Sequence, residues 1–248
     1  MSIKAAGTPR IDVAGLGKSF GGQRAIAGFD LRVTGGELIV LVGANGGGKT
    51  TSLRMLAGLI APDAGTGDVL GRDVRQPQRA DRARIGFMTQ RIGLYPELTV
   101  RDNLMFRARM HGLDRAGARV DEAISVHGLA RYAAARAAHL SVGWARRVQF
   151  AATLLHAPPL LLLDEPTAGL DPVTREDIWE QLAALADAGH SVIVSTHDLA
   201  EAERCGRLIY FQDGEADGPM TPEALRTRGG AATLDAAVIA LARHAVAR

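Results

Sequence analysis

The sequence has 248 residues, 47% of them hydrophobic, which is enough apolar material for a globular chain with a substantial core. A formal net charge of +2 is too small to indicate a nucleic-acid surface, so no nucleic-acid partner is expected. Cys205 is the only cysteine, which excludes an internal disulfide and favours the cytosol. The longest nearly apolar stretch, 150–163, contains His156 and two prolines and falls short of a membrane span, and the N-terminus lacks the pattern of a secretion signal.

The first expected elements are strands of an antiparallel sheet. The segments "RIDVAGLGKSF" and "GFDLRVTGGE" alternate polar and apolar residues and contain glycine turns. Continuously apolar runs follow, and such runs are typical of parallel strands that are covered on both faces. Helical segments separate these runs, so we expect an α/β fold with a mostly parallel sheet and an N-terminal antiparallel β subdomain. The four runs span residues 38–42, 85–88, 160–163 and 191–195.

Residues 91–157 show mainly helical signals. Thr99 and Asp102 form a short capping box, and Gly112 lies where that helix should end. A second helix is expected to end at Gly128, with an apolar face made by Val120, Ala123, Ile124 and His127. We therefore predict an all-helical subdomain inserted into the α/β core.

The C-terminal part of the sequence predicts a hairpin and a final helix. Asp213 and Gly214 in "RLIYFQDGEAD" give the hairpin signal. The segment "ATLDAAVIALARHAVAR" predicts a helix after Gly229 and Gly230. We expect one domain over residues 1–228, including the insertion, and a helical tail over residues 229–248.

A phosphate-binding loop is predicted between the strand "LIVLV" and the helical pattern "TSLRMLAGL". The segment "GANGGGKTT" fits G-x-x-x-x-G-K-[ST], and its position between strand and helix makes the match specific. Its glycines let several backbone N–H groups face a polyphosphate, and the helix N-terminus adds partial positive charge. Lys49 is expected to contact the β- and γ-phosphates, and Thr50 to bind Mg²⁺. The nucleotide-contacting set is Gly43, Ala44, Asn45, Gly46, Gly47, Gly48, Lys49, Thr50 and Thr51.

Two carboxylates follow the buried strand "LLLL". Because parallel strand ends open onto one crevice, Asp164 is expected to approach Mg²⁺ bound to the phosphates. Adjacent strand residues point to opposite sides, so Glu165 should have a different role. Beyond the strand end, it can polarise a water in line with the γ-phosphate.

The order of these motifs resembles the nucleotide-binding subunit of an ABC transporter over residues 13–228. The resemblance implies a P-loop ATPase fold with ATP and Mg²⁺ as its ligands. "GANGGGKTT" resembles the family's Walker A loop, and "LLLLDEP" resembles its Walker B strand with Glu165 as the catalytic glutamate. Lys49 would then act in catalysis as well as in binding.

Four further residues owe their expected roles to this resemblance. Gln90 resembles the glutamine that touches Mg²⁺ and the attacking water, which makes it both a catalytic and a metal-binding residue. His197 resembles the switch histidine that contacts the γ-phosphate. Phe20 resembles the aromatic residue that stacks on adenine, and Asp171 lies in the segment that resembles the D-loop.

The segment "LSVGW" occupies the place of the family's Leu-Ser-Gly-Gly-Gln signature, which closes over the Walker A loop of a second subunit. Ser141 and Gly143 are retained and are expected to contact ATP, whereas Val142 and Trp144 depart from the pattern. Valine adds a branched Cβ and would resist positive φ. Trp144 begins an apolar helical stripe, so core packing and an interface role both remain open. We expect ATP hydrolysis that is slower than with the usual motif.

The resemblance also implies partners and a location. The chain would dimerise with a second ATPase subunit, identical or related, and act on a separate integral membrane permease, which places it in the cytoplasm on the inner face of the cell membrane. Similarity to drug and polysaccharide efflux subunits favours export, and the permease is expected near residues 95–104. Two alternatives remain open: a soluble ABC ATPase without a transport role, and a regulatory subunit that binds ATP and turns it over slowly.

Overall fold

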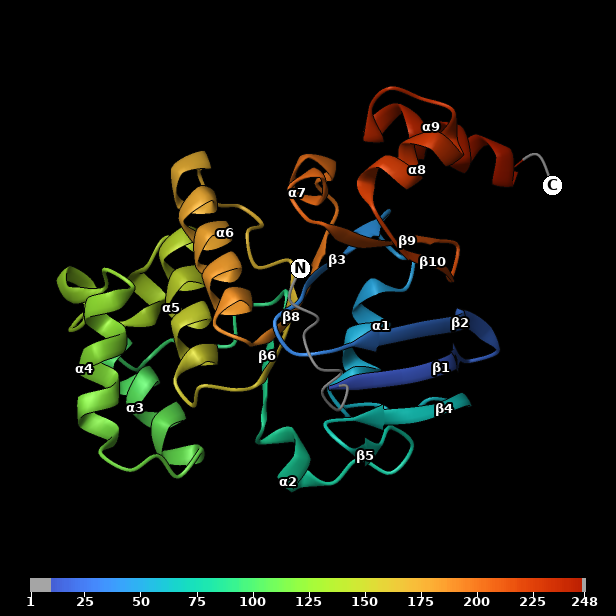
Figure 1. The fold of residues 1–248 in the computed structure, drawn as a ribbon. Helices are drawn as coiled ribbons and strands as arrows, with labels where there is room; N and C mark the ends of the chain where they lie inside the picture. Colours follow the sequence, from blue (N-terminus) through green and yellow to red (C-terminus); the bar gives the residue numbers. More distant parts are fainter. Residues whose placement is uncertain (1–9, 247–248) are drawn as a thin grey trace, which may run out of the picture.

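The computed structural model describes residues 10–246, which form a mixed sheet with helices on both sides (Figure 1). Residues 247–248 and residues 1–9, where a secretion signal would begin, lie outside this description. The described residues form a ten-stranded sheet in the order β5-β4-β1-β2-β10-β9-β3-β8-β7-β6. Among the same residues, no helix combines the length and apolar character needed to cross a bilayer.

The N-terminal half of the sheet is antiparallel, as the sequence predicts. Strand β1 pairs with both β2 and β4, and β4 pairs with β5. Buried side chains such as Leu16 and Phe29 face the same core cluster as Leu53 of helix α1. The elements are β1 (Ile11–Phe20), β2 (Gln23–Val33), β4 (Ala64–Val69), β5 (Arg72–Asp73) and α1 (Lys49–Leu56).

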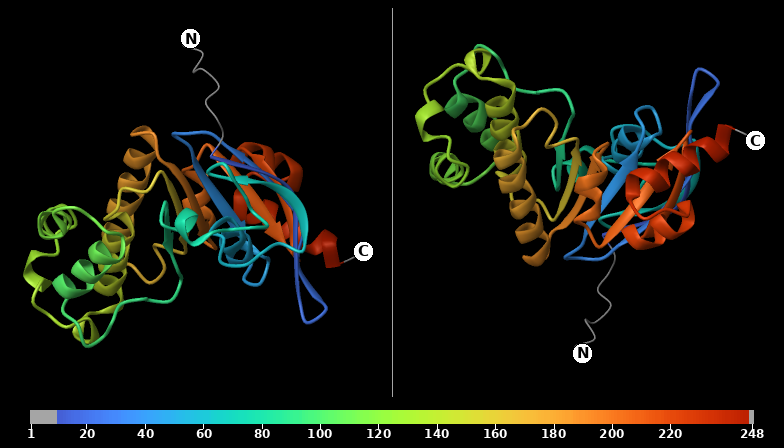
Figure 2. Two further views of the ribbon diagram at one scale, coloured as in Figure 1. Left: turned by 90° about the horizontal axis from the view of Figure 1, so that it is seen from below. Right: turned by 90° about the horizontal axis from the view of Figure 1, so that it is seen from above.

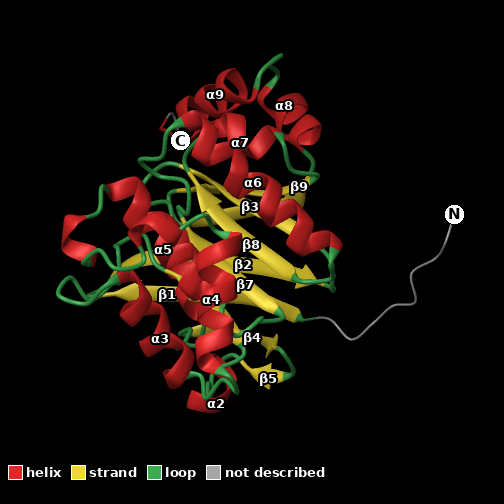
Figure 3. Cartoon of the chain, turned by 90° about the vertical axis from the view of Figure 1, so that its left-hand side faces the viewer, coloured by secondary structure: helices red, strands yellow, loops and turns green. Residues whose placement is uncertain are grey.

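The other half is parallel, and all four predicted apolar runs are strands in it. Ile39 and Leu41 point into one core cluster, whereas Val40 and Val42 point into another, which explains why the run is apolar throughout. Helix α6, which Figure 3 shows in front of the strands, packs into the second of these clusters, whereas α1 packs into the first and so covers the other face of the sheet. The elements are β3 (Leu38–Gly43), β6 (Ile85–Met88), β7 (Leu160–Asp164), β8 (Ser191–Thr196), β9 (Arg207–Gln212), α6 (Pro172–Asp187) and α7 (Leu199–Glu203).

The predicted helical insertion is a separate layer beside the parallel strands (Figure 2). It has its own apolar core, which includes Leu104, Ile124 and Val148. Thr99 caps the first helix by accepting a 3.0 Å hydrogen bond from the Asp102 amide. The elements are α3 (Val100–Met110), α4 (Ala116–Val126), α5 (Val142–Leu154) and the short 3₁₀ turns η1 (Ala130–Tyr132) and η2 (Ala137–His139); α2 (Arg79–Arg82) precedes β6.

The C-terminal helices pack on the α/β core. Strand β10 (Glu215–Met220) forms the predicted hairpin with β9, and α8 (Pro222–Gly229) and α9 (Leu234–Val246) follow. The predicted boundary after residue 228 falls inside α8, which continues through Gly229. Leu234 is fully buried in the same core cluster as the apolar side chains of α6, and Ala237 is fully buried beside it in α9. The predicted tail is therefore packed against the domain, because its apolar face completes that cluster.

Candidate functional site

The phosphate loop connects the end of β3 to the start of α1. Gly43 has φ 146°, and a Cβ there would overlap the carbonyl oxygen of Phe211. Gly48, the residue that precedes α1, has φ 112°, and a Cβ there would overlap the side chain of Ile26. Gly48 offers no side-chain cap, and the first turn of α1 contains no acidic residue. The amides of this helix start are thus available to an anion.

A cavity of about 360 Å³ lies over this helix start. The loop contributes most of its lining, and the remaining two residues follow the ends of the parallel strands β6 and β7. The lining residues are Asn45, Gly46, Gly48, Lys49, Thr50, Thr51, Gln90 and Glu165. Gln90 and Glu165, which follow Thr50 by 40 and 115 positions in the sequence, therefore line one cavity with the phosphate loop.

Lys49 is buried at the base of the loop. Its Nζ donates to the carbonyl oxygens of Gly43 at 2.6 Å and Ala44 at 3.0 Å. Burial lowers the pKa of the Lys49 ammonium, and the negative charges of Glu165 and Asp164 act in the opposite direction. The ammonium is held by groups that a phosphate oxygen can replace, so Lys49 is placed to bind a polyphosphate.

Asp164 lies at the end of β7, facing the loop. Its carboxylate accepts hydrogen bonds from the Thr50 hydroxyl at 2.9 Å and the Ser195 hydroxyl at 2.6 Å. Hydroxyl and carboxylate oxygens are the donors that Mg²⁺ prefers in proteins, so this pair fits the predicted metal role.

Glu165 follows directly and has different partners, as strand alternation predicts. Its φ of 50° is unusual for a residue with a side chain, and its amide donates to the carbonyl and hydroxyl oxygens of Ser195 at 3.1 and 3.0 Å. The carboxylate accepts a hydrogen bond from Gln90 Nε2 at 3.0 Å and lies 3.3 Å from His197 Nδ1. It lines both the loop cavity and a neighbouring cavity of about 90 Å³ that includes His197.

The remaining predicted site residues lie away from the loop cavity. Phe20 is half exposed at the end of β1, with Lys18 Nζ 5.6 Å from its ring centroid. Ser141 begins α5, where its hydroxyl accepts from the Trp144 amide at 3.4 Å. Asp171 begins α6 and accepts from the amides of Val173 and Thr174, and these hydrogen bonds, those of Thr174 foremost, lower the pKa of its carboxyl group.

The two departures from the usual signature have separate structural settings. Val142 is the first residue of α5 and is 58% exposed, so the positive φ that valine resists is not required there. A Cβ at Gly169 would lie 3.7 Å from Val142 Cγ1, so the signature segment rests against the 168–171 loop of its own chain. Trp144 packs against Tyr132 with ring centroids 4.5 Å apart, which supports the packing interpretation of this residue.

Three polar residues at this site were not identified from the sequence. Ser195 holds both Asp164 and Glu165, and its position opposite Asp164 in the β7–β8 register was a usable signal. Arg146 and Gln149 are each only 5% exposed, and they bind the backbone around Gln90. No local pattern distinguished these two from other polar residues of a helix.

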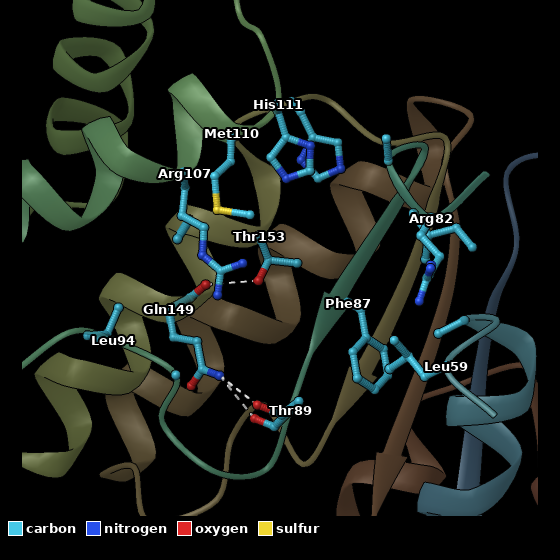
Figure 4. Close-up of a pocket in the computed structure, with 16 residues that line it drawn as sticks. Leu59, Arg82, Phe87, Thr89, Leu94, Arg107, Met110, His111, Gln149 and Thr153 are labelled. Carbon is cyan, nitrogen blue, oxygen red and sulfur yellow. Dashed lines mark hydrogen bonds between the residues drawn. The ribbon is translucent and has the colours of Figure 1, made fainter. Parts of the chain in front are cut away.

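A second groove, of about 440 Å³, lies between α1, β6 and the helical insertion (Figure 4). Leu59, Phe87 and Met110 give it apolar walls, and Arg107 and Arg82 carry positive charge at its edge. His111 stacks on His156 with ring centroids 3.8 Å apart, and burial lowers the pKa of His156 to about 4. Leu94, Thr89 and Gln149 connect this groove to the loop that carries Gln90.

Comparisons with known proteins agree with this geometry. The family model described as ABC transporter matches residues 26–168. Nod factor export ATP-binding protein I of Paraburkholderia xenovorans (strain LB400) is 41% identical over 211 residues, which are 84% of this chain and 69% of the relative. A solved ATP-binding subunit of an ABC transporter matches with a TM-score of 0.83 at 28% identity, over 92% of this chain and 98% of that chain. A dimeric ATP-binding cassette with ADP and Pi, in a post-hydrolysis state, matches with a TM-score of 0.78 at 28% identity, over 85% and 98%.

Proposed function

This chain belongs to the ABC transporter family of ATP-binding proteins, and on that premise we propose that Glu165, Gln90 and His197 carry out its ATP hydrolysis. The protein is an ATP-binding and ATP-hydrolysing subunit of a transporter. One observation supports the residue assignment above all others. The Glu165 carboxylate contacts both Gln90 and His197 on a wall that the phosphate-loop cavity shares with its neighbour.

In the proposed reaction, Glu165 accepts a hydrogen bond from a water molecule and orients it toward the γ-phosphorus of ATP. The water oxygen forms a new bond to phosphorus while the bond to the ADP oxygen breaks. The proton passes to Glu165 and then to the released phosphate. Lys49 stabilises the negative charge of the transferring phosphoryl group, and Gln90 and His197 hold the carboxylate in position.

Thr50, Asp164 and Gln90 would hold Mg²⁺, which would neutralise charge on the phosphate oxygens when bound. The oxygen donors of Thr50 and Asp164 already lie 2.9 Å apart, which fits a small hard cation. Ser195 keeps the Asp164 carboxylate oriented through its 2.6 Å hydrogen bond.

We propose that two ATPase subunits bind ATP between them, in a homodimer or heterodimer. Ser141, Gly143 and Asp171 would contact the nucleotide from the second subunit, and Phe20 would stack on its adenine. Binding across the dimer interface accounts for the position of Ser141, Gly143 and Asp171 outside the loop cavity of their own chain. The exposed side chain of Val142 would lie in that interface.

The groove between the α/β core and the helical insertion is the proposed docking site for a membrane permease. Its apolar walls suit a short amphipathic helix. Tyr95 and Phe106, both exposed and packed edge to face with centroids 4.9 Å apart, extend the apolar surface beyond it. None of the residues expected from the sequence, 95–104, lines this groove, and Val100, Asn103 and Leu104 are buried. Binding there would hold the protein at the cytoplasmic face of the membrane, and the similarity to an export protein supports export.

Glu165→Gln tests the catalytic assignment. This variant should bind ATP as the unaltered chain does, while the steady-state release of phosphate falls by about 100-fold or more, because an amide cannot accept the proton. Glu180→Gln, an exposed change on α6, is the matched control. Full turnover by Glu165→Gln would contradict the proposed function.

Met110→Glu tests the docking assignment. Met110 lines the groove and is 60% exposed in the free chain. A docked permease would cover this position, so Met110→Glu would bury a charge in the complex and should weaken binding. The tagged chain would be used to capture membrane proteins from detergent extracts of the cells that encode it, with mass spectrometry as the readout. We expect a protein with several membrane spans, lost with Met110→Glu and kept with Val126→Glu. Equal capture by both variants would place the docking site elsewhere.

A further inference from the structure

Of the three buried polar side chains of helix α5, Arg146 and Gln149 lie nearest the signature segment. Arg146 and Gln149 are each 5% exposed and lie three positions apart, on one face of the helix. A buried guanidinium and a buried amide are costly unless their hydrogen bonds are made. Arg146 Nη1 and Gln149 Nε2 find their partners on the loop that follows β6, the loop that carries Gln90, whereas Arg146 Nε and Gln149 Oε1 have no partner among the described residues.

Arg146 binds the backbone of Gln90 itself. Its Nη1 donates to the carbonyl oxygen of Gln90 at 2.7 Å and lies 3.4 Å from that of Thr89. Burial lowers the pKa of the guanidinium, and the charges of Glu165 and Asp164 act in the opposite direction. Arg146 therefore lies within the electrostatic reach of the carboxylate that Gln90 contacts.

Gln149 binds the residues on either side of Gln90. Its Nε2 donates to the carbonyl oxygens of Thr89 at 3.1 Å and Arg91 at 3.0 Å, and lies 3.3 Å from the Thr89 hydroxyl. Figure 4 shows the bonds between Gln149 and Thr89 at the floor of the groove. The two side chains together hold three consecutive carbonyl groups, those of residues 89, 90 and 91.

We propose that Arg146 and Gln149 are positioning residues that hold the 89–91 backbone, so that the Gln90 amide stays 3.0 Å from Glu165. The inference rests on the proposed roles of Gln90 and Glu165. Ser141 caps the N-terminus of α5, and Arg146 lies in the same helix. A displacement of that N-terminus therefore moves Arg146 and Gln149, and the backbone of residues 89–91 that they bind, by a similar distance. When the signature segment of one subunit contacts ATP in the proposed dimer, the resulting movement of α5 would change the position of Gln90 relative to Glu165 in that same subunit.

A double-mutant cycle tests this assignment. Arg146→Met should lower kcat for ATP about tenfold and leave KM within about twofold, because nucleotide contacts are intact. In a Gln90→Ala chain, Arg146→Met should change kcat by less than about twofold, since its effect passes through Gln90. Arg146→Lys, which keeps one donor, should recover part of the rate, and Gln149→Met should act in the same direction as Arg146→Met.

Arg147→Met is the matched control for the cycle. Arg147 is the next residue of α5, but it pairs with Asp177 of α6 at 2.8 Å. Any decrease in kcat caused by Arg147→Met should be independent of Gln90, so the fold decrease in the double variant should equal the product of the two single decreases. Amide hydrogen exchange of residues 89–93 provides a measurement independent of turnover, and it should become faster in Arg146→Met but not in Arg147→Met.

The outcomes separate the two hypotheses. If Gln90→Ala leaves turnover unchanged, the proposed role of Gln90 fails. If Gln90→Ala lowers turnover while Arg146→Met does not, or while the two losses multiply, only the positioning role of Arg146 is overturned. Unchanged exchange at residues 89–93 in Arg146→Met would overturn it as well.

Discussion

The phosphate loop and the signature segment each begin a helix, yet they differ in how completely their own chain surrounds them. Helix α1 starts after Gly48 with no side-chain cap, beneath a cavity that also contains Lys49 and Glu165. Helix α5 starts after Ser141, whose hydroxyl already accepts from a helix amide, and its first residue, Val142, is largely exposed. One helix start is built to receive an anion within the chain, and the other faces outward.

This difference predicts unequal tolerance to substitution. At the phosphate loop, an added Cβ at Gly43 or Gly48 would overlap atoms of Phe211 or Ile26. At the signature, a Cβ at Gly143 would come no closer than 3.5 Å to Leu170 Cδ2, an ordinary van der Waals contact. The chain therefore restrains the phosphate loop strongly and the signature weakly, and in the proposed dimer a second subunit would restrain the signature.

The largest effect that would sharpen this comparison is expected from Lys49→Ala. Loss of a buried cation at the phosphate site should lower ATP turnover by about 100-fold or more. Ser141→Ala, which removes only an N-cap and one polar contact, should lower it by about tenfold or less. Steady-state phosphate release measures the ATP turnover of the two variants. Arg54→Ala, on the exposed face of α1, is the control. Equal losses would remove the distinction between the two helix starts.

An intermediate effect concerns a histidine that is buried at the end of α4, against α5. His127 is 6% exposed and meets the Phe150 ring at 86° with centroids 5.8 Å apart. Burial, followed by the charge of Arg147, lowers the pKa of His127 from 6.5 to about 4. The unfolded chain then binds more protons between these values, so stability falls as the pH drops from 6.5 toward 4, by about 2 kcal/mol between pH 7 and 5.

Denaturant unfolding at pH 7 and pH 5 measures this contribution. His127→Gln should lose part of the acid sensitivity, whatever its stability at pH 7, and His156, whose pKa burial also lowers to about 4, should retain the rest. His139→Gln, at an exposed position, should keep it. If His127→Gln and the unaltered chain lose stability in parallel, burial of the neutral His127 does not contribute to the acid sensitivity.

The smallest effect is expected from restoring the usual signature. Val142→Gly with Trp144→Gln should raise ATP turnover by about threefold, which corresponds to roughly 0.6 kcal/mol of transition-state free energy. The same change removes the Trp144 contact with Tyr132, so the unfolding midpoint should fall. Measuring Val142→Gly and Trp144→Gln separately would show which residue changes the turnover and which changes the unfolding midpoint. An unchanged rate would rule out any tuning of turnover by these departures.

Much of the site was predictable because its residues lie at the ends of recognisable elements. The run 38–42 identified the strand before the phosphate loop, and the four leucines of 160–163 identified the strand that ends at Asp164. Parallel pairing then brings these ends to one edge, where Thr50 and Asp164 meet. Gln90 and His197 both contact Glu165, and the roles that the family resemblance implies for them stay predictions.

The sequence by itself determined the four buried strands, the main helices of the insertion and the phosphate loop, because periodicity, caps and glycines act over a few neighbouring residues. Only the tertiary structure decided that Arg146 and Gln149 hold the Gln90 loop, across 56 to 60 positions of chain. It also decided that Trp144 packs on Tyr132 and that α8 and α9 close the core. Such contacts depend on which faces meet when the layers pack, and side chains with the same local pattern can face solvent in another fold.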